Sequence, residues 1–362
     1  MWYSIGKSNP FEAAFMIVTN AVAQSFDGNV LVQTCSRAIT VIGCSTFDTN
    51  LRLQSRFPLQ RDATYCTESG TKMHTTVISV NKLVVIAHTW YNAYYHLLTE
   101  AMSRLMILHE LLVLDPDIYI LLQHPIYSNS ATDLFNLFGI DNKRVIYFYS
   151  SPRENGTLYR AKIMFVPRGI GCGGAPPSLL EQIHVKALNF VYNRSTPPKP
   201  YLSLPLPVVL NKNHNITFQH KNVTRVKAGP IIIISRSITR PRHLKNEMEI
   251  MHFLSKEYSA IPVVFFLSNI SLIDTIAMFN SARVVIAPHG AGQIHLLWMR
   301  QGTAIIEISP AASFNGCFQP IATYRQVHSY IYFDPHASGR GGLQVNMTNF
   351  SQFFREVMQG RY

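Results

Sequence analysis

The segment from residue 94 to residue 104 combines side chains that could move a proton. His96, Glu100 and Arg104 recur at intervals of four residues, so in a helix they would share one face. A carboxylate between an imidazole and a guanidinium is a candidate general base, able to deprotonate an attacking hydroxyl group. By spacing alone, an ordinary structural Glu–Arg pair is the simpler interpretation.

A second segment, residues 284–295, could bind an anion. It reads Val-Val-Ile-Ala-Pro-His-Gly-Ala-Gly-Gln-Ile-His, which predicts a buried strand, a small-residue turn and the start of a helix. Open α/β sheets bind ligands outside the carboxyl ends of their strands. Gly290 and Gly292 would let an anion approach the backbone, and the helix N-terminus would favour its charge. The spacing is not that of a dinucleotide fingerprint, and a turn that binds no ligand is an equal alternative.

Polar residues at the ends of two further apolar runs would lie at the same sheet edge. Ser235 and Arg236 follow a run of isoleucines, where a guanidinium could hold a diphosphate through two parallel hydrogen bonds. Glu307 lies in the apolar run 304–308, and its carboxylate needs a partner there, either a ribose diol or an Arg or Lys elsewhere. The nearby basic residues are more typical of a solvated loop; they are Arg240, Arg242 and Lys245.

The elements that would position these residues alternate between apolar runs and helical patterns from residue 75 onwards. The predicted strands are residues 77–87, 118–122, 145–149, 163–166, 231–235, 263–267, 284–287, 304–308 and 330–333. The predicted helices are residues 90–114, 132–138, 179–192, 244–256, 272–280 and 292–299. Continuous apolar strands joined by helices are typical of parallel sheets covered on both faces.

A proline-rich stretch divides this alternation in two. Residues 196–229, which begin with five closely spaced prolines, are the predicted linker between Rossmann-like domains at 75–195 and 230–345. Residues 1–74 show no clear period and are left unassigned. The amphipathic tail, residues 346–362, is expected to form a helix that packs back onto the first domain.

Composition limits the class of protein and of ligand. The 362 residues carry a net charge of +12, and 47% are hydrophobic, which excludes a disordered chain. The basic residues are dispersed, so a phosphate-bearing ligand fits better than nucleic acid. The five cysteines include no C-x-x-C pair, and no zinc or other metal site is predicted.

Seven N-x-S/T acceptor sites favour the lumen of the secretory pathway. They begin at Asn155, Asn193, Asn215, Asn222, Asn269, Asn346 and Asn349. The first residues make a poor signal peptide, because Glu12 adjoins the short apolar run 13–18. No apolar stretch reaches 18 residues, so no membrane-spanning helix is predicted.

Three motifs, in this order, resemble those of glycosyltransferase family 61, which includes plant β-1,2-xylosyltransferase and the protein O-linked N-acetylglucosaminyltransferases. They are Asn92-Ala-Tyr-Tyr-His-Leu-Leu-Thr-Glu100 with Arg104, Ile234-Ser-Arg236, and Ala287-Pro-His-Gly-Ala-Gly292 followed by Gly302 and Glu307. The resemblance spans about residues 75–335. It implies a GT-B fold, with two Rossmann-like domains facing across a cleft, and an inverting enzyme of the Golgi or ER lumen.

The resemblance also implies a reaction and a role for each residue. The enzyme would transfer xylose, N-acetylglucosamine or arabinose from a UDP-sugar to a hydroxyl of a glycan or glycoprotein, with no tightly bound cofactor and no need for a divalent metal. Glu100 would be the catalytic base, with His96 beside it and Arg104 in support. The donor site would comprise Ser235, Arg236, His289, Gly290, Ala291, Gly292 and Glu307, with Glu307 against the nucleoside. Gln293, His295 and Arg300 depart from the family pattern and leave the donor sugar open.

Two alternatives stand beside this interpretation. A non-catalytic glycan- or nucleotide-binding module on the same fold would keep the donor site and have no use for Glu100. An α/β-hydrolase is suggested by the likeness of the turn at residues 289–292 to an H-G-G-G oxyanion loop. That fold needs a G-x-S-x-G elbow, which the sequence lacks.

Overall fold

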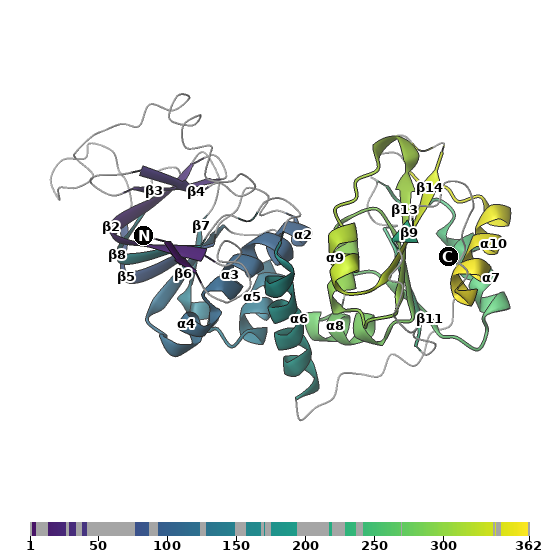
Figure 1. Cartoon of the computed structure of the whole chain (residues 1–362), viewed down its shortest axis with the longest axis horizontal. Coiled ribbons are helices and arrows are strands. Elements are labelled where there is room, and N and C mark those ends of the chain that lie inside the picture. The colour runs from purple at the N-terminus through teal and green to yellow at the C-terminus, as the bar shows by residue number, and fades with distance from the viewer. Residues whose placement is uncertain are drawn as a thin grey trace. The chain divides into compact units, whose positions relative to one another are not determined.

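The chain divides into two compact units, Met1–Lys186 and Ala187–Tyr362. The computed structural model describes residues 2–4, 14–26, 29–33, 38–41, 77–86, 93–123, 128–148, 157–167, 170, 175–193, 217–218, 229–236, 242–268, 270–335, 337 and 342–360. Each unit combines helices with a sheet that contains parallel strands, which confirms the predicted α/β class (Figure 1). Most of the predicted linker lies outside the described residues.

The sheet of the first unit is mixed. Its strands run in the order β4-β3-β2-β8-β5-β6-β7, and β1 pairs with β2 outside this path. The bounds are β1 Trp2–Ser4, β2 Ala14–Phe26, β3 Asn29–Gln33, β4 Ala38–Val41, β5 Val77–Val85, β6 Ile118–Gln123, β7 Val145–Phe148 and β8 Leu158–Pro167. Strand β5 pairs in parallel with β6 and β8, and β6 with β7, whereas every pair that includes β1, β2, β3 or β4 is antiparallel. The expectation of a parallel sheet therefore holds for β5 to β8 only, and residues 1–74 supply the rest.

Strand β2 shows why the N-terminal region carries no clear period. Asn20 adopts a positive φ of 49° in the middle of the strand. The buried side of β2 changes there, from Val18 before it to Ala21 and Ala23 after it. An alternating pattern that changes phase within one strand cannot be recognised as a single strand.

The helical run that carries His96 and Glu100 is not one helix. It consists of α2 Tyr94–His96, the π-helix η3 Leu97–Met102, α3 Ser103–Ile107 and α4 His109–Leu114. The predicted single helix 90–114 is wrong in this respect, since Leu108 breaks it with φ −116° and ψ 10°. Every side chain of residues 97–109 is buried, so this segment has no amphipathic period from which the helix breaks could be predicted. Tertiary packing determines where the helices begin and end. The other helices of this unit are α5 Ser128–Leu137, η4 Asn142–Arg144 and α6 Pro177–Tyr192, the last of which crosses the unit boundary.

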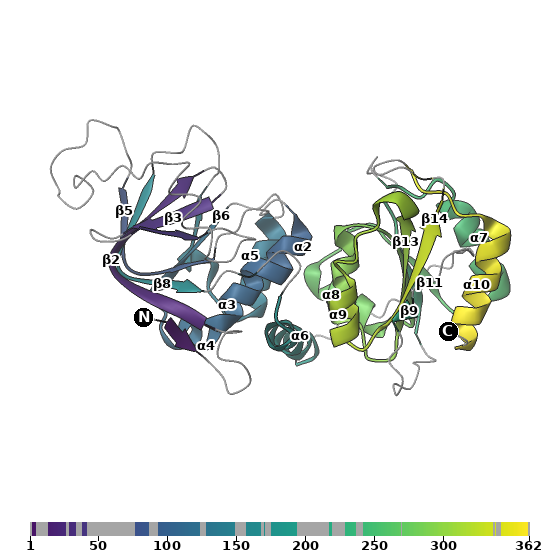
Figure 2. The ribbon, with the colours of Figure 1, turned by 45° about the horizontal axis from the view of Figure 1, so that its top comes forward.

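The sheet of the second unit is parallel apart from one edge. Its order is β11-β10-β12-β13-β14-β9, and only the edge strand β9 is antiparallel among the described strands. The bounds are β9 Thr217–Phe218, β10 Ile231–Ile234, β11 Val263–Phe266, β12 Val284–Pro288, β13 Ala304–Pro310 and β14 His328–Asp334. The helices are α7 Glu247–Glu257, α8 Leu272–Ser281, α9 Gln319–Tyr324 and α10 Met347–Gln359, with 3-10 helices η5 Ala291–Trp298 and η6 Ala311–Ser313. In Figures 1 and 2, α7 and α10 cover one face of this sheet, and α8 and α9 cover the other.

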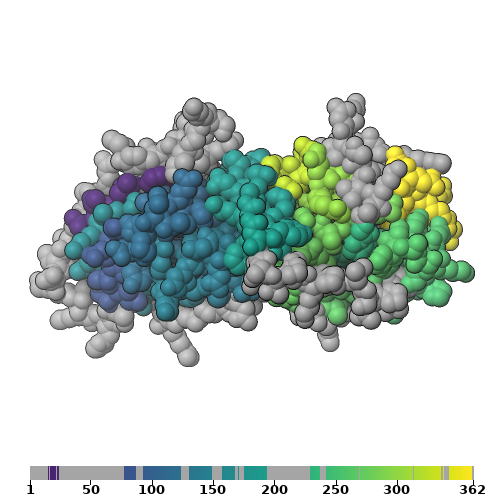
Figure 3. All heavy atoms as spheres, turned by 90° about the horizontal axis from the view of Figure 1, so that it is seen from below, coloured from purple at the N-terminus to yellow at the C-terminus, as the bar shows by residue number. Residues whose placement is uncertain are grey.

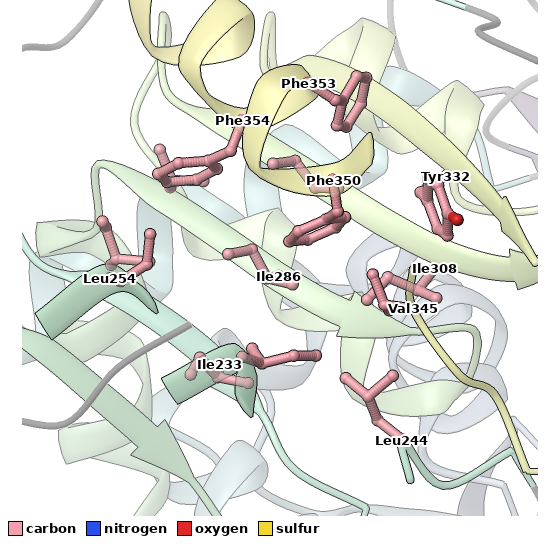
Figure 4. Close-up of a cluster of buried hydrophobic side chains, with 14 of the residues drawn as sticks. Ile233, Leu244, Leu254, Ile286, Ile308, Tyr332, Val345, Phe350, Phe353 and Phe354 are labelled. Carbon is pink, nitrogen blue, oxygen red and sulfur yellow. The ribbon is translucent and has the colours of Figure 1, made fainter. Parts of the chain in front are cut away.

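The C-terminal helix α10 belongs to the second unit, so the prediction that it packs back onto the first domain is wrong. Phe350, Phe353, Phe354 and Val357 recur at helical spacing and are buried in the core of this unit. Figure 4 shows Phe350 near the strand residue Ile286, and Phe354 on the side of Leu254 of α7. In Figure 3 the yellow C-terminal residues lie against the green residues of α7. The buried side chains of α10 thus pack on one face of the sheet in their own unit, and this contact determines where the helix lies.

We expect Phe354→Ala to destabilise the second unit by about 3–5 kcal/mol, because it removes a fully buried ring. The Phe354 ring packs edge-on against Tyr258, with 5.0 Å between centroids. Denaturant unfolding of the whole chain measures the change. Gln359→Ala, on the exposed side of the same helix, is the matched control. Equal midpoints for the two variants would contradict this account of the core.

Candidate functional site

Glu100 lies in the π-helix η3, inside the buried helical run of the first unit. A π-turn widens the helix by one residue per hydrogen bond, and such turns occur often at functional sites. Despite the wider turn, His96 and Glu100 meet as their spacing predicts: the imidazole Nδ1 donates to Glu100 Oε1 at 2.5 Å. The carboxylate can only accept, so the ring proton sits on Nδ1 and Nε2 is the nitrogen outside this bond.

The two members of this pair differ in exposure. The Glu100 side chain is 0% exposed and the His96 side chain is 21% exposed. The aromatic ring of Tyr95 stands edge-on to the imidazole, with 5.1 Å between centroids. The histidine thus forms the accessible face of the pair, and the carboxylate lies behind it.

Arg104 lies four residues after Glu100 in the same helical run and is completely buried. Burial lowers its pKa to about 10, and the negative charge of Glu100 partly opposes that shift. A buried guanidinium near a buried carboxylate offsets the cost of placing either charge in the interior. The structure therefore brings the three predicted residues of the first unit together.

In the second unit, Arg236 and the glycine turn meet at the carboxyl edge of the sheet. Arg236 follows β10, and the turn at residues 289–292 follows β12, the strand next to it. A Cβ atom on Gly290 would overlap the guanidinium Nη1 and Cζ atoms of Arg236. Only glycine at position 290 lets the guanidinium lie this close to the backbone of the turn.

His289 is held by two consecutive residues of β13. Its backbone N–H donates to the carbonyl of Ile308 at 2.8 Å. Its Nδ1 donates to Glu307 Oε1 at 2.5 Å, and the side chains are 11% and 1% exposed, respectively. Glu307 Oε2 is buried and has no hydrogen-bond partner among the described residues. Such an orphaned acceptor fits a ligand that brings a hydroxyl or N–H donor.

Gly292, in the second half of the turn, packs on strand β10. A Cβ on Gly292 would stand 3.0 Å from Ile234 Cγ2, so this glycine lets the turn lie directly on β10. The predicted helix 292–299 forms as the 3-10 helix η5, which begins at Ala291. His295, which departs from the family pattern, is buried between Phe266 and Phe279, with ring centroids 5.0 and 4.8 Å away. Burial lowers the pKa of His295 to about 3, so this residue is a neutral core histidine.

Ser235, a predicted donor-binding residue, contacts another residue of its own unit. Its hydroxyl donates to Glu247 Oε1 at 2.7 Å. Burial raises the pKa of Glu247, and the hydrogen bond from Ser235 opposes that rise. The bond ties the end of β10 to the first turn of α7 and so fixes the position from which Arg236 extends.

Sequence reasoning missed the segment after β13. Phe318 stands edge-on to the His289 ring, with 5.5 Å between centroids. Cys317 has a pKa of about 12, because burial and the charge of Glu307 raise it while Arg242 opposes the rise. These residues therefore line the same edge of the sheet. Cys317 and Phe318 follow the carboxyl end of the parallel strand β13, and this position is the sequence feature that could have identified them.

The described residues show two further properties of the chain. No described helix is long and apolar enough to cross a membrane, and no three His, Cys, Asp or Glu side chains gather there as metal ligands would. Of the predicted glycosylation sites, Asn193 and Asn346 are exposed and Asn349 is half-buried in the first turn of α10. The sites that lie outside the described residues are Asn155, Asn215, Asn222 and Asn269.

We expect Gly290→Ala to weaken the binding of pyrophosphate strongly while leaving the thermal unfolding midpoint nearly unchanged. The new methyl group meets only the flexible end of Arg236, which can swing aside without disturbing the core. Calorimetric titration with pyrophosphate checks the first point. Gly316→Ala is the control, since its nearest neighbours would be 3.6 Å from the new Cβ, an ordinary contact. Unchanged pyrophosphate affinity in Gly290→Ala would show that the guanidinium position does not matter.

Comparison with known proteins gives this arrangement a family. Over 112 residues the chain is 27% identical to protein O-linked-mannose beta-1,4-N-acetylglucosaminyltransferase 2 of Tetraodon nigroviridis, a match that covers 30% of this chain and 19% of that relative. The chain thus matches about a fifth of the length of this relative. The family model described as Glycosyltransferase 61 matches residues 94–306, which is more than half of the chain and includes Glu100, Arg236 and His289. The chain belongs to glycosyltransferase family 61.

Proposed function

We propose that this protein is an inverting glycosyltransferase that moves a sugar from a UDP-sugar to a hydroxyl group of a glycan or glycoprotein. Membership of a glycosyltransferase family supports glycosyl transfer in general. The observation that carries the donor assignment is the close approach of Arg236 to Gly290 at the carboxyl edge of a parallel sheet. The candidate sugars are xylose, N-acetylglucosamine and arabinose.

In this proposal the second unit binds the donor. Arg236 and the N-terminus of η5 hold the diphosphate, because both present positive charge at the sheet edge. The exposed side of His289 faces the same anion. Glu307 Oε2, which is an orphaned acceptor among the described residues, accepts a hydroxyl of the ribose. Stabilising the charge that develops on a leaving diphosphate is the kind of interaction that lowers a transfer barrier most.

The first unit would activate the acceptor. The attacking hydroxyl loses its proton to the His96–Glu100 pair while its oxygen bonds to the anomeric carbon. The bond from that carbon to the diphosphate breaks on the opposite face, and the bonding electrons leave with the diphosphate, so the configuration inverts. Because His96 is the exposed member of the pair, we assign the proton to its Nε2, with Glu100 holding Nδ1–H.

The proposal extends to fold and compartment. A GT-B arrangement would place the acceptor side of the first unit opposite the donor side of the second. Secretory-pathway lumen is the proposed location, supported by family membership and by the exposed acceptor sites Asn193 and Asn346. The reaction as written requires no divalent metal, since arginine and helix N–H groups take the role of the cation.

The first test is thermal unfolding with a panel of UDP- and GDP-sugars, with free UDP as the reference. A ligand at about 100 times its dissociation constant adds about 2.7 kcal/mol to the free energy of unfolding. For a unit of this size, we expect the midpoint to rise by roughly 5–11 °C. One family of UDP-sugars should stabilise the protein at least as well as UDP. A folded sample that no nucleotide stabilises would favour the non-catalytic alternative.

The second test separates donor binding from chemistry. We expect Glu100→Gln and His96→Asn each to lower kcat by about 10²- to 10⁴-fold, the usual contribution of a general base. Neither variant should change the stabilisation by UDP. Glu110→Gln replaces an exposed carboxylate of the neighbouring helix α4 and is the matched control. Full activity of His96→Asn, with loss only in Glu100→Gln, would make the carboxylate itself the base.

A further inference from the structure

Arg242 adopts a backbone conformation that arginine rarely takes. Its φ is +59°, in the left-handed region, where a residue with a Cβ is strained. Its Nε is buried and has no hydrogen-bond partner among the described residues. Strain of this kind persists only where the surroundings enforce it, and it concentrates at ligand-binding sites.

The residues that follow Arg242 are fixed by a short parallel pairing. His243 O accepts from Leu343 N at 2.8 Å, and Lys245 N donates to Leu343 O at 2.8 Å. Asn246 then exchanges two hydrogen bonds with the backbone of Val345, at 2.8 and 3.1 Å. The strained residue therefore extends from a rigid support and does not belong to a free solvated loop.

This support lies at the edge of the sheet that carries Arg236. Five residues after Arg242, Glu247 opens α7 and accepts the hydroxyl of Ser235, the neighbour of Arg236. The charges of Arg242 and Glu307 both act on Cys317, which places that arginine on the same side as the His289–Glu307 pair. Arg236 and Arg242 thus lie at the same edge of the sheet as the single carboxylate of Glu307. This excess of positive charge suits a multiply charged anion.

We propose that Arg242 is a second guanidinium of the anion site and contacts the diphosphate that Arg236 binds. This inference rests on the proposed function for the identity of the anion. It reverses the sequence-based interpretation of Arg242 as part of a solvated basic loop. The unfavourable backbone of Arg242 is retained because it directs a charge with an unused donor at the ligand.

The test compares Arg242→Asn with Lys245→Ala by calorimetric titration of UDP, pyrophosphate and uridine. Asparagine tolerates the left-handed region, so Arg242→Asn relieves the strain while removing the charge. We expect it to unfold at the same temperature as the wild type or higher, and to bind UDP and pyrophosphate about 10- to 100-fold more weakly, the effect of losing one charged hydrogen bond. Uridine affinity should not change. Lys245→Ala removes an exposed charge from the same segment and should leave all three affinities within about twofold.

Each outcome separates this inference from the proposed function. If Arg242→Asn binds UDP as well as Lys245→Ala does, the inference is overturned and the donor assignment stands. If the wild type binds pyrophosphate through Arg242 but no nucleotide, the anion site stands and the UDP-sugar assignment fails. Wild-type protein that binds neither overturns both. Arg242→Lys keeps the charge without the bidentate fork and should lose part of the affinity, which guards against a folding defect in the asparagine variant.

Discussion

The absence of a Cβ at position 290 is the constraint on which the proposed donor site of the second unit depends. The guanidinium of Arg236 occupies the space that any other side chain would need. That closeness is possible because β10 and β12 are adjacent parallel strands, so the residues that follow them leave the sheet side by side. Position 292 also favours glycine, because a Cβ there would crowd the side chain of Ile234 in β10. The turn therefore packs against both the arginine and the sheet beneath it.

In each unit a buried carboxylate accepts a hydrogen bond from a histidine. Glu100 and Glu307 each accept from the Nδ1 of a histidine at 2.5 Å, and in each pair the histidine is the more exposed member. The carboxylate fixes the orientation of the ring and the proton on Nδ1. One pair is built on a π-helix and the other on two neighbouring strands, so the shared geometry arises from side-chain chemistry and not from a shared element.

The sequence predicts the second unit better than the first, for physical reasons. Strand β10 is a run of four isoleucines, and β12 and β13 are similarly continuous, because parallel strands are buried on both faces. Strand β2 changes its buried side at Asn20 and hides its period, although the Asp27-Gly28 pair after it is a usual hairpin signal. No pattern reports the π-turn at Glu100, since all its side chains are buried. The position of Arg236 could be predicted because it follows a strand. The position of Arg242 could not, because the residues after it are fixed by the pairing of Leu244 with Leu343, about a hundred residues away.

The histidine beneath the turn gives the second unit a sensitivity to acid that is separate from its chemistry. His295 has a pKa of about 3 in the folded chain, because burial opposes its charge, and close to 6.5 when unfolded. Above pH 6.5 both states leave it neutral and nothing is lost. As the pH falls below that value, the unfolded chain binds a proton that the folded chain refuses, and the free energy of unfolding drops by about 1.4 kcal/mol per pH unit. The helix that begins at the glycine turn is therefore suited to near-neutral surroundings, and acidification would destabilise it.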